Sequence, residues 1–180
     1  MKKLLPWLVI GLAIRLGLMM YTLHPDIRGH NLAAYLIAQK GQILSFYDYL
    51  RLQPRTDPLV VLYRDDIFAY PPLAYLTHAL SNFILYPLYP QQLFHSLILD
   101  IGQTAGHPQL PWLLLLLKFP YLVADTICLF GIHRFLNVKH RFLGSILWIF
   151  NPLTLYSAYM LAEFDIFIAL FILLALFKPH

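Results

Sequence analysis

The chain has 180 residues, of which 59% are hydrophobic and only 12% charged, and its mean hydropathy is +0.63. A soluble domain of this length cannot bury so much apolar surface, so the composition excludes a soluble globular protein and indicates one that resides in a bilayer. The net charge of +4 comes from lysines and arginines scattered between apolar segments, which excludes the dense basic surface typical of nucleic-acid binding.

The first predicted element is a membrane-spanning helix from about residue 4 to 23. Lys2 and Lys3 precede an apolar stretch of roughly the 20 residues that cross a hydrocarbon core. No small-residue cleavage site follows, and Arg15 interrupts the stretch, so we expect an uncleaved helix rather than a signal peptide. The two lysines place its start in the cytoplasm.

A long first outer segment is predicted from about residue 24 to 110. Within it, the apolar spacing of residues 31–40 predicts a short amphipathic helix at the membrane surface, ended by Gly41. Residues 70–89 are again apolar, but Pro71, Pro72 and Pro87 break them. This pattern favours a membrane-associated segment that packs on protein and does not cross the bilayer.

Three further spanning helices are predicted at about residues 111–132, 142–160 and 165–177. The connection at 133–142 carries Arg134, Lys139 and Arg141 and is therefore expected in the cytoplasm. The last apolar segment, which ends before Lys178, is shorter than the roughly 17 residues that span comfortably, so we expect an N-terminal portion of a longer chain. The predicted fold class is an all-α integral membrane protein of the cytoplasmic membrane, a polytopic helical bundle whose long first extracytoplasmic loop carries juxtamembrane helices.

Two opposite charges, Lys118 and Asp125, lie inside the apolar run 111–132. Seven residues separate them, which on a helix gives nearly the same face but about 10 Å of axial separation, too far for a direct ion pair. In one interpretation Lys118 extends to the outer interface and Asp125 pairs with Arg15 of the first helix. In the other, this face lines a polar cavity, because charged side chains inside a membrane normally face protein or water.

An ordered set of motifs runs along nearly the whole chain. It consists of Arg15 in the first helix, then Asp26, Gly41 and Tyr47, then YPPL at residues 70–73, LKFPYLVAD at 117–125, WIFNP at 148–152 and AEFD at 162–165. This order resembles that of the GT-C glycosyltransferases, multispanning enzymes that take a sugar from a polyprenyl-phosphate donor, and in particular their mannosyltransferase-like members. Relatives usually show GQFD at the last motif, so Glu163 replaces an uncharged amide while Asp165 keeps its place.

The resemblance implies inverting sugar transfer to a hydroxyl on the extracytoplasmic face, with Asp26 as the general base. A solvated acid or a helix cap is the alternative reading of Asp26. The resemblance and the local chemistry also favour substrate-binding residues, with Arg28 facing a phosphate. These residues are Arg28, Tyr70, Lys118, Asp125, Glu163 and Asp165.

The donor is expected to be lipid-linked, because no glycine-rich phosphate loop appears in the sequence. Adjacent Asp65 and Asp66 form a weak candidate site for a divalent metal ion, since hard cations prefer carboxylate oxygens, although such pairs often stay solvated. The histidines show no zinc-binding spacing beyond a weak one at His24 and His30.

Two functions from different classes follow from the sequence. The first is a polyprenyl-phosphate-sugar-dependent hexosyltransferase, or its N-terminal part, whose partners are the lipid-linked donor, a glycan, lipid or protein acceptor, and membrane lipids. The second is a non-catalytic polytopic scaffold, such as a lipid-carrier translocation or assembly subunit. Substitution of Asp26 separates the two, because only the enzyme needs a base there.

Overall fold

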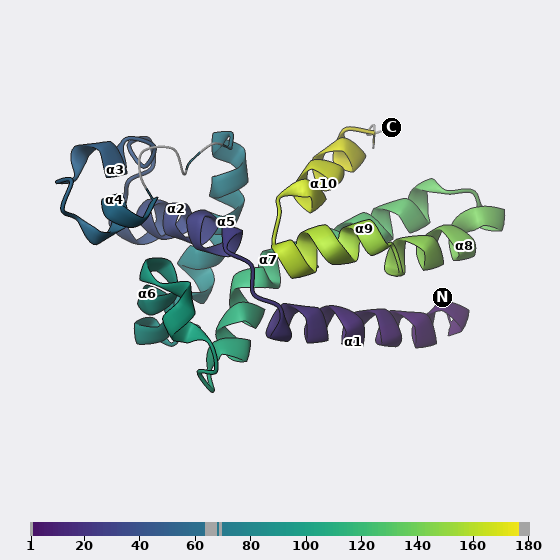
Figure 1. Cartoon of the computed structure of the whole chain (residues 1–180). Helices are drawn as coiled ribbons and strands as arrows, with labels where there is room; N and C mark the ends of the chain where they lie inside the picture. The colour runs from purple at the N-terminus through teal and green to yellow at the C-terminus, as the bar shows by residue number, and fades with distance from the viewer. Residues whose placement is uncertain (1, 64–67, 69, 177–180) are drawn as a thin grey trace. The chain divides into compact units, whose positions relative to one another are not determined.

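The computed structural model describes residues 2–63, 68 and 70–176, and within these ranges the chain is helical and contains no strand (Figure 1). The expected all-α class is therefore confirmed for the described residues. The chain divides into two compact units. Unit 1 comprises the residues up to His24 together with those from Lys118 onward, and unit 2 comprises Pro25–Leu117.

Unit 2 is built around α2 (Asp26–Lys40), which packs against α5 (Pro72–Leu85) and α6 (Gln91–Leu99). Its shorter elements are α3 (Tyr49–Leu52), α4 (Pro58–Tyr63), η2 (Tyr86–Leu88) and η3 (Ile101–Thr104). Small and branched side chains of α2, such as Ala33, Ala34 and Leu36, are fully buried, and this allows close approach of the neighbouring helices. The predicted outer loop is thus largely helical and has its own apolar core.

Helix α2 begins five residues before the predicted start at residue 31, which corrects the placement of Asp26 in a loop. Pro25 stands at the N-cap with φ −56°, a value that its ring imposes and that suits a helix start, and Asp26 is the first helical residue. The predicted end is confirmed. Gly41 has φ 67°, and its backbone N–H donates to the Leu36 carbonyl, the left-handed termination that glycine adopts without strain.

Unit 1 contains η1 (Lys2–Leu4), α1 (Leu5–Tyr21), the part of α7 (Leu110–Phe135) from Lys118 onward, α8 (Val138–Ile149), α9 (Pro152–Thr154), η4 (Leu155–Leu161) and α10 (Asp165–Leu176). The single helix predicted at 142–160 is wrong, because α8 ends at Ile149 and a π-helical segment, η4, follows. Pro152 cannot continue α8, and the Asn151 side chain accepts from the Leu153 N–H to start a new turn. The predicted connection at 133–142 shrinks to Leu136 and Asn137.

Three charged side chains are buried inside unit 1, while many of its large apolar side chains are exposed. Arg15, Lys118 and Asp125 are 6%, 0% and 2% exposed, respectively. The buried positions of α1 are Gly11, Arg15 and Met19, four residues apart on one stripe, while its leucines and isoleucines are largely exposed. Soluble proteins show the reverse distribution, so the side-chain arrangement of unit 1 fits an apolar solvent.

Among the described helices, α7 is long and apolar enough to cross a membrane by itself. A second candidate arises if α1 and α2 count together as one broken span, and α10 is apolar but only 12 residues long. The apolar part of the combined candidate belongs to α1, because α2 carries Asp26, Arg28 and Lys40.

Candidate functional site

A half-open pocket of about 260 Å³ lies in unit 2 at the N-terminal end of α2. It brings together residues from the start of α2, the end of α4 and the segment before α5. Three of the predicted site residues share it, namely Asp26, Arg28 and Tyr70. The other residues lining the pocket are Pro25, Gly29, His30 and Tyr63.

The first turn of α2 gives the pocket its polarity. The first backbone N–H groups of a helix have no intrahelical partner, and the helix dipole is positive at this end, so an anionic ligand is favoured here. The exposed carboxylate of Asp26 stands in this first turn and is itself stabilised by the same dipole. His30 follows one helical turn later on the same face and is 5% exposed.

Arg28 supplies the positive charge of the pocket. Its guanidinium carbon lies 5.6 Å from the centroid of the Tyr63 ring, a cation–π distance. Its Nε atom is buried and has no hydrogen-bond partner among the described residues. The Tyr63 hydroxyl donates to the Ile98 carbonyl. Burial raises the pKa of Tyr63 to about 12, against the opposing effect of the Arg28 charge, so Tyr63 remains a neutral phenol.

Tyr70 is held in the pocket wall through its backbone. Its carbonyl accepts from the Tyr47 hydroxyl at 2.6 Å, and its N–H donates to the Tyr75 hydroxyl at 3.2 Å. The Tyr70 ring, 40% exposed, contacts His30 edge-on at 5.5 Å between centroids. Behind it, burial and then the nearby His30 lower the pKa of His78 to about 3, which keeps His78 uncharged. Tyr47, part of the motif set, thus has a structural role in positioning Tyr70.

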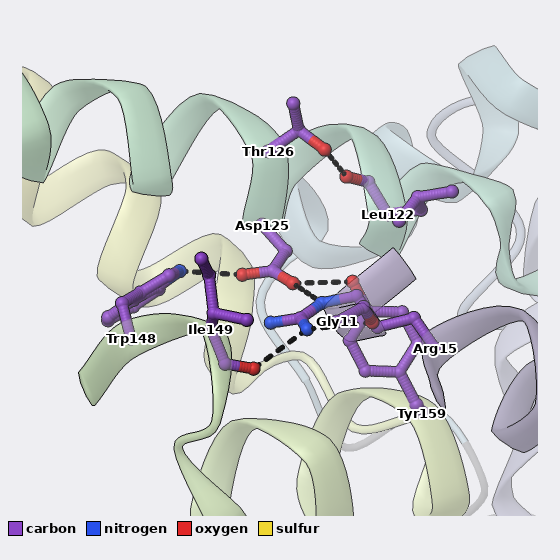
Figure 2. A network of polar contacts seen from close by, with 8 residues as sticks. All are labelled: Gly11, Arg15, Leu122, Asp125, Thr126, Trp148, Ile149 and Tyr159. Atoms are coloured by element: carbon purple, nitrogen blue, oxygen red, sulfur yellow. Dashed lines mark hydrogen bonds and ion pairs between the residues drawn. The ribbon is translucent and has the colours of Figure 1, made fainter. Parts of the chain in front are cut away.

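A second polar cluster lies inside unit 1 and is centred on Asp125 (Figure 2). The carboxylate accepts from Arg15 Nε at 2.5 Å, from the Tyr159 hydroxyl at 2.6 Å and from Trp148 Nε1 at 2.7 Å. Arg15 Nη1 also donates to the Ile149 carbonyl at 2.8 Å, where α8 ends. The expected pairing of Asp125 with Arg15 is therefore confirmed. The pair joins α1, α7 and α8 by polar bonds within an otherwise apolar contact.

Lys118 is held by a separate set of acceptors. Its ammonium donates to the Thr22 carbonyl at 2.7 Å, the Thr22 hydroxyl at 2.8 Å and the Tyr159 carbonyl at 2.7 Å. These three bonds use all three of its N–H donors. The interpretation in which Lys118 extends to the interface is wrong, because the side chain is 0% exposed.

The AEFD motif forms the turn between η4 and α10. Ala162 has φ 63°, the left-handed conformation, and its carbonyl accepts from the Tyr121 hydroxyl at 2.5 Å. The Glu163 N–H donates to the Ser157 carbonyl, and its side chain is half-buried. Asp165, the first residue of α10, accepts from the Ser157 hydroxyl at 2.6 Å.

The predicted site residues thus belong to two different units. Asp26, Arg28 and Tyr70 share the pocket in unit 2, whereas Lys118, Asp125, Glu163 and Asp165 lie in unit 1, where the first two are fully engaged by protein groups. Sequence reasoning missed Tyr63, which carried no signal. It also missed His30 as a pocket residue, although its spacing of four from Asp26 would have indicated a shared face had the helix start been recognised.

No group of three or more histidine, cysteine, aspartate or glutamate side chains that could hold a metal ion occurs within the described residues. Asp65 and Asp66, the weak candidates for metal binding, lie outside the described residues.

Comparison of the chain with protein-family models, with curated proteins and with solved structures gave no match. The likeness to GT-C enzymes consequently rests on the motif order alone.

Proposed function

We propose that the chain belongs to an integral membrane glycosyltransferase that transfers a sugar from a polyprenyl-phosphate donor to a hydroxyl on the extracytoplasmic face. The observation that carries the proposal is the pocket at the start of α2, which gathers Asp26, Arg28 and Tyr70. A carboxylate and a guanidinium in the lining of one pocket at a helix N-terminus suit a reaction in which a hydroxyl loses a proton and a phosphate leaves.

The proposed step is a single displacement with inversion. The acceptor oxygen bonds to the anomeric carbon as the bond from that carbon to the lipid phosphate breaks, and the hydroxyl proton passes to Asp26. The negative charge on the departing phosphate is offset by Arg28 and by the backbone N–H groups of the first α2 turn. The exposed Tyr70 ring offers a surface for the sugar. In the proposed topology the N-terminus is cytoplasmic and the chain is multi-pass, with unit 2 outside.

The alternative of a non-catalytic scaffold draws on unit 1. Its buried charges, Arg15, Lys118 and Asp125, all bond to protein groups, as expected of residues that hold helices together.

The test replaces Asp26 by Asn in the natural, full-length protein and measures sugar transfer in membrane vesicles supplied with a polyprenyl-phosphate sugar. Loss of the base is expected to lower turnover by about 10²-fold to 10⁴-fold without loss of membrane insertion. Asp48→Asn is the matched control, because Asp48 is an exposed acid of the same unit that pairs with the exposed Arg51. If Asp26→Asn turns over as fast as Asp48→Asn, Asp26 is not the base. If the unaltered protein transfers sugar from none of the donors supplied, the result favours the non-catalytic scaffold.

A further inference from the structure

Helix α5 carries large apolar side chains on the side that faces away from the other helices of unit 2. Its buried positions are Tyr75, His78, Ala79 and Asn82, and two of these four are polar. Its exposed positions after Pro72 are all large and apolar, with exposed fractions between 41% and 67%. We name them the α5 outer face: Leu73, Leu76, Leu80, Phe83 and Ile84. A helix in water would show the opposite arrangement, so this face needs an apolar environment.

The C-terminal end of α5 carries residues typical of a membrane–water boundary. Trp112, 47% exposed, donates its indole N–H to the carbonyl of Leu88, just beyond α5. Tyr86 packs near Tyr35, at 5.8 Å between ring centroids. Amphipathic aromatic rings of this kind concentrate at the level of lipid headgroups. Trp112 is also the third residue of α7, the candidate span, so this end of α5 lies where that span begins.

A positive charge stands beside these aromatic rings. The exposed ammonium of Lys40 lies 5.6 Å from the centroid of the Tyr35 ring, and the His95 ring contacts Tyr35 at 5.4 Å. Burial and then the neighbouring Lys40 lower the pKa of His95, so Lys40 is the cation of the group. We name Lys40, Tyr86 and Trp112 the α5 collar. Lipid phosphates complement a cation in this position.

We propose that the α5 outer face lies in the hydrocarbon of the bilayer and that the α5 collar binds the headgroups of anionic lipids. The 14 residues of α5 extend about 21 Å, less than the roughly 30 Å of the hydrocarbon core. The helix is therefore an interfacial element and does not cross. This lipid site does not depend on the proposed sugar transfer.

The first experiment measures the environment of the outer face. The full chain, with Cys128→Ala removing the single cysteine, is reconstituted into vesicles with a nitroxide spin label at Leu80→Cys or Phe83→Cys. Collisions with oxygen, which partitions into hydrocarbon, are expected to exceed collisions with a water-soluble nickel chelate. Gln92→Cys, exposed on α6, is the control and should show the reverse. Frequent collisions between the nickel chelate and the label at both α5 positions would overturn the proposal, because the face would then be in water. Few collisions with both reagents would also overturn it, because a second copy or another protein would then cover the face.

The second experiment tests the collar. A fluorophore at Leu88→Cys, in the same background, is quenched by brominated phosphatidylglycerol or brominated phosphatidylcholine in vesicles that contain equal amounts of both lipids. Quenching by the anionic lipid is expected to be stronger by up to about fivefold, the factor for one lysine near an anionic surface, and Lys40→Gln should abolish the difference. Arg51→Gln, an exposed cation elsewhere in unit 2, is the control. Equal quenching by the two lipids in the unaltered collar would refute headgroup binding.

Discussion

Removal of either member of the buried ion pair between Arg15 and Asp125 is expected to destabilise the protein severely, and removal of both is expected to cost less than the sum of the two single losses. The perturbations are Arg15→Met, Asp125→Leu and the double variant. Each replaces a charged side chain by an apolar one of similar size, so that packing around α1, α7 and α8 changes little. The two residues are 110 positions apart in the sequence, so any coupling between them is tertiary.

The magnitude follows from the contacts of the carboxylate. Asp125→Leu leaves the Arg15 guanidinium, the Trp148 indole N–H and the Tyr159 hydroxyl without this acceptor. Breaking a buried pair by removing one partner costs about 3–5 kcal/mol, and we expect this from either single variant. The double variant leaves no buried charge, but the Trp148 and Tyr159 donors lack an acceptor and the Ile149 carbonyl lacks its Arg15 donor, at about 1–3 kcal/mol each. Two single losses of about 4 kcal/mol and a double loss of about 6 kcal/mol give a coupling free energy of about 2 kcal/mol.

The assay is equilibrium unfolding of the full chain in detergent micelles by added sodium dodecyl sulfate, followed by circular dichroism. The four free energies of unfolding complete a double-mutant cycle. Thr126→Val is the matched control, because Thr126 is the exposed neighbour of Asp125 and its hydroxyl donates to the Leu122 carbonyl of its own helix. It should change the free energy by less than about 0.5 kcal/mol. Additive single effects, or a loss below about 1 kcal/mol for Asp125→Leu, would show that the pair does not hold unit 1 together.

Three other predictions concern single positions. Gly11→Ala would place a Cβ in steric clash with the Ile149 Cγ2, so we expect a loss of about 1–3 kcal/mol in the same unfolding assay, partly recovered when Ile149→Ala is added. Ala162→Val puts a branched side chain at φ 63° and should lower stability by more than about 1 kcal/mol, whereas Ala162→Gly should be tolerated. Because His78 has a pKa near 3 in the folded chain and about 6.5 when unfolded, the unfolded state binds the extra proton, and stability should fall as the pH drops from about 6.5 towards 3. His78→Gln should flatten that dependence in unfolding curves measured across this pH range.

Helix existence was largely predictable from the sequence, and helix boundaries were not. The strongly apolar runs that became α1, α7 and α10 tolerate single charges such as Arg15 without losing their helical pattern, and their positions match the expected ones within a few residues. The start of α2 was missed because Asp26, Arg28 and His30 give a polar first turn that reads as a loop. The break after α8 was missed, because the sequence does not reveal whether Pro152 bends a helix or ends it.

The candidate site was predictable only in part. Asp26, Arg28 and Tyr70 were chosen from their chemistry and from the motif order, and the structure places them in one pocket. Tyr63 could not have been found, because it reaches the pocket only through the packing of α4. The hydrogen-bond acceptors of Lys118 could not be predicted either. Lys118 bonds mainly to backbone carbonyls, and every residue has a carbonyl whatever its side chain.

Those carbonyls have a consequence for the order in which the protein can be made. Lys118 takes one acceptor from Tyr159, which is 41 positions later, and Arg15 takes one from Ile149, which is 134 positions later. At a synthesis rate of about 5–20 residues per second, the ammonium of Lys118 waits roughly 2–8 seconds for its last partner. During that time the ammonium has only part of its final set of acceptors. The segments from α8 to η4 therefore complete the bonding of helices made before them, and until they arrive the free N–H donor of Lys118 needs water or another polar partner.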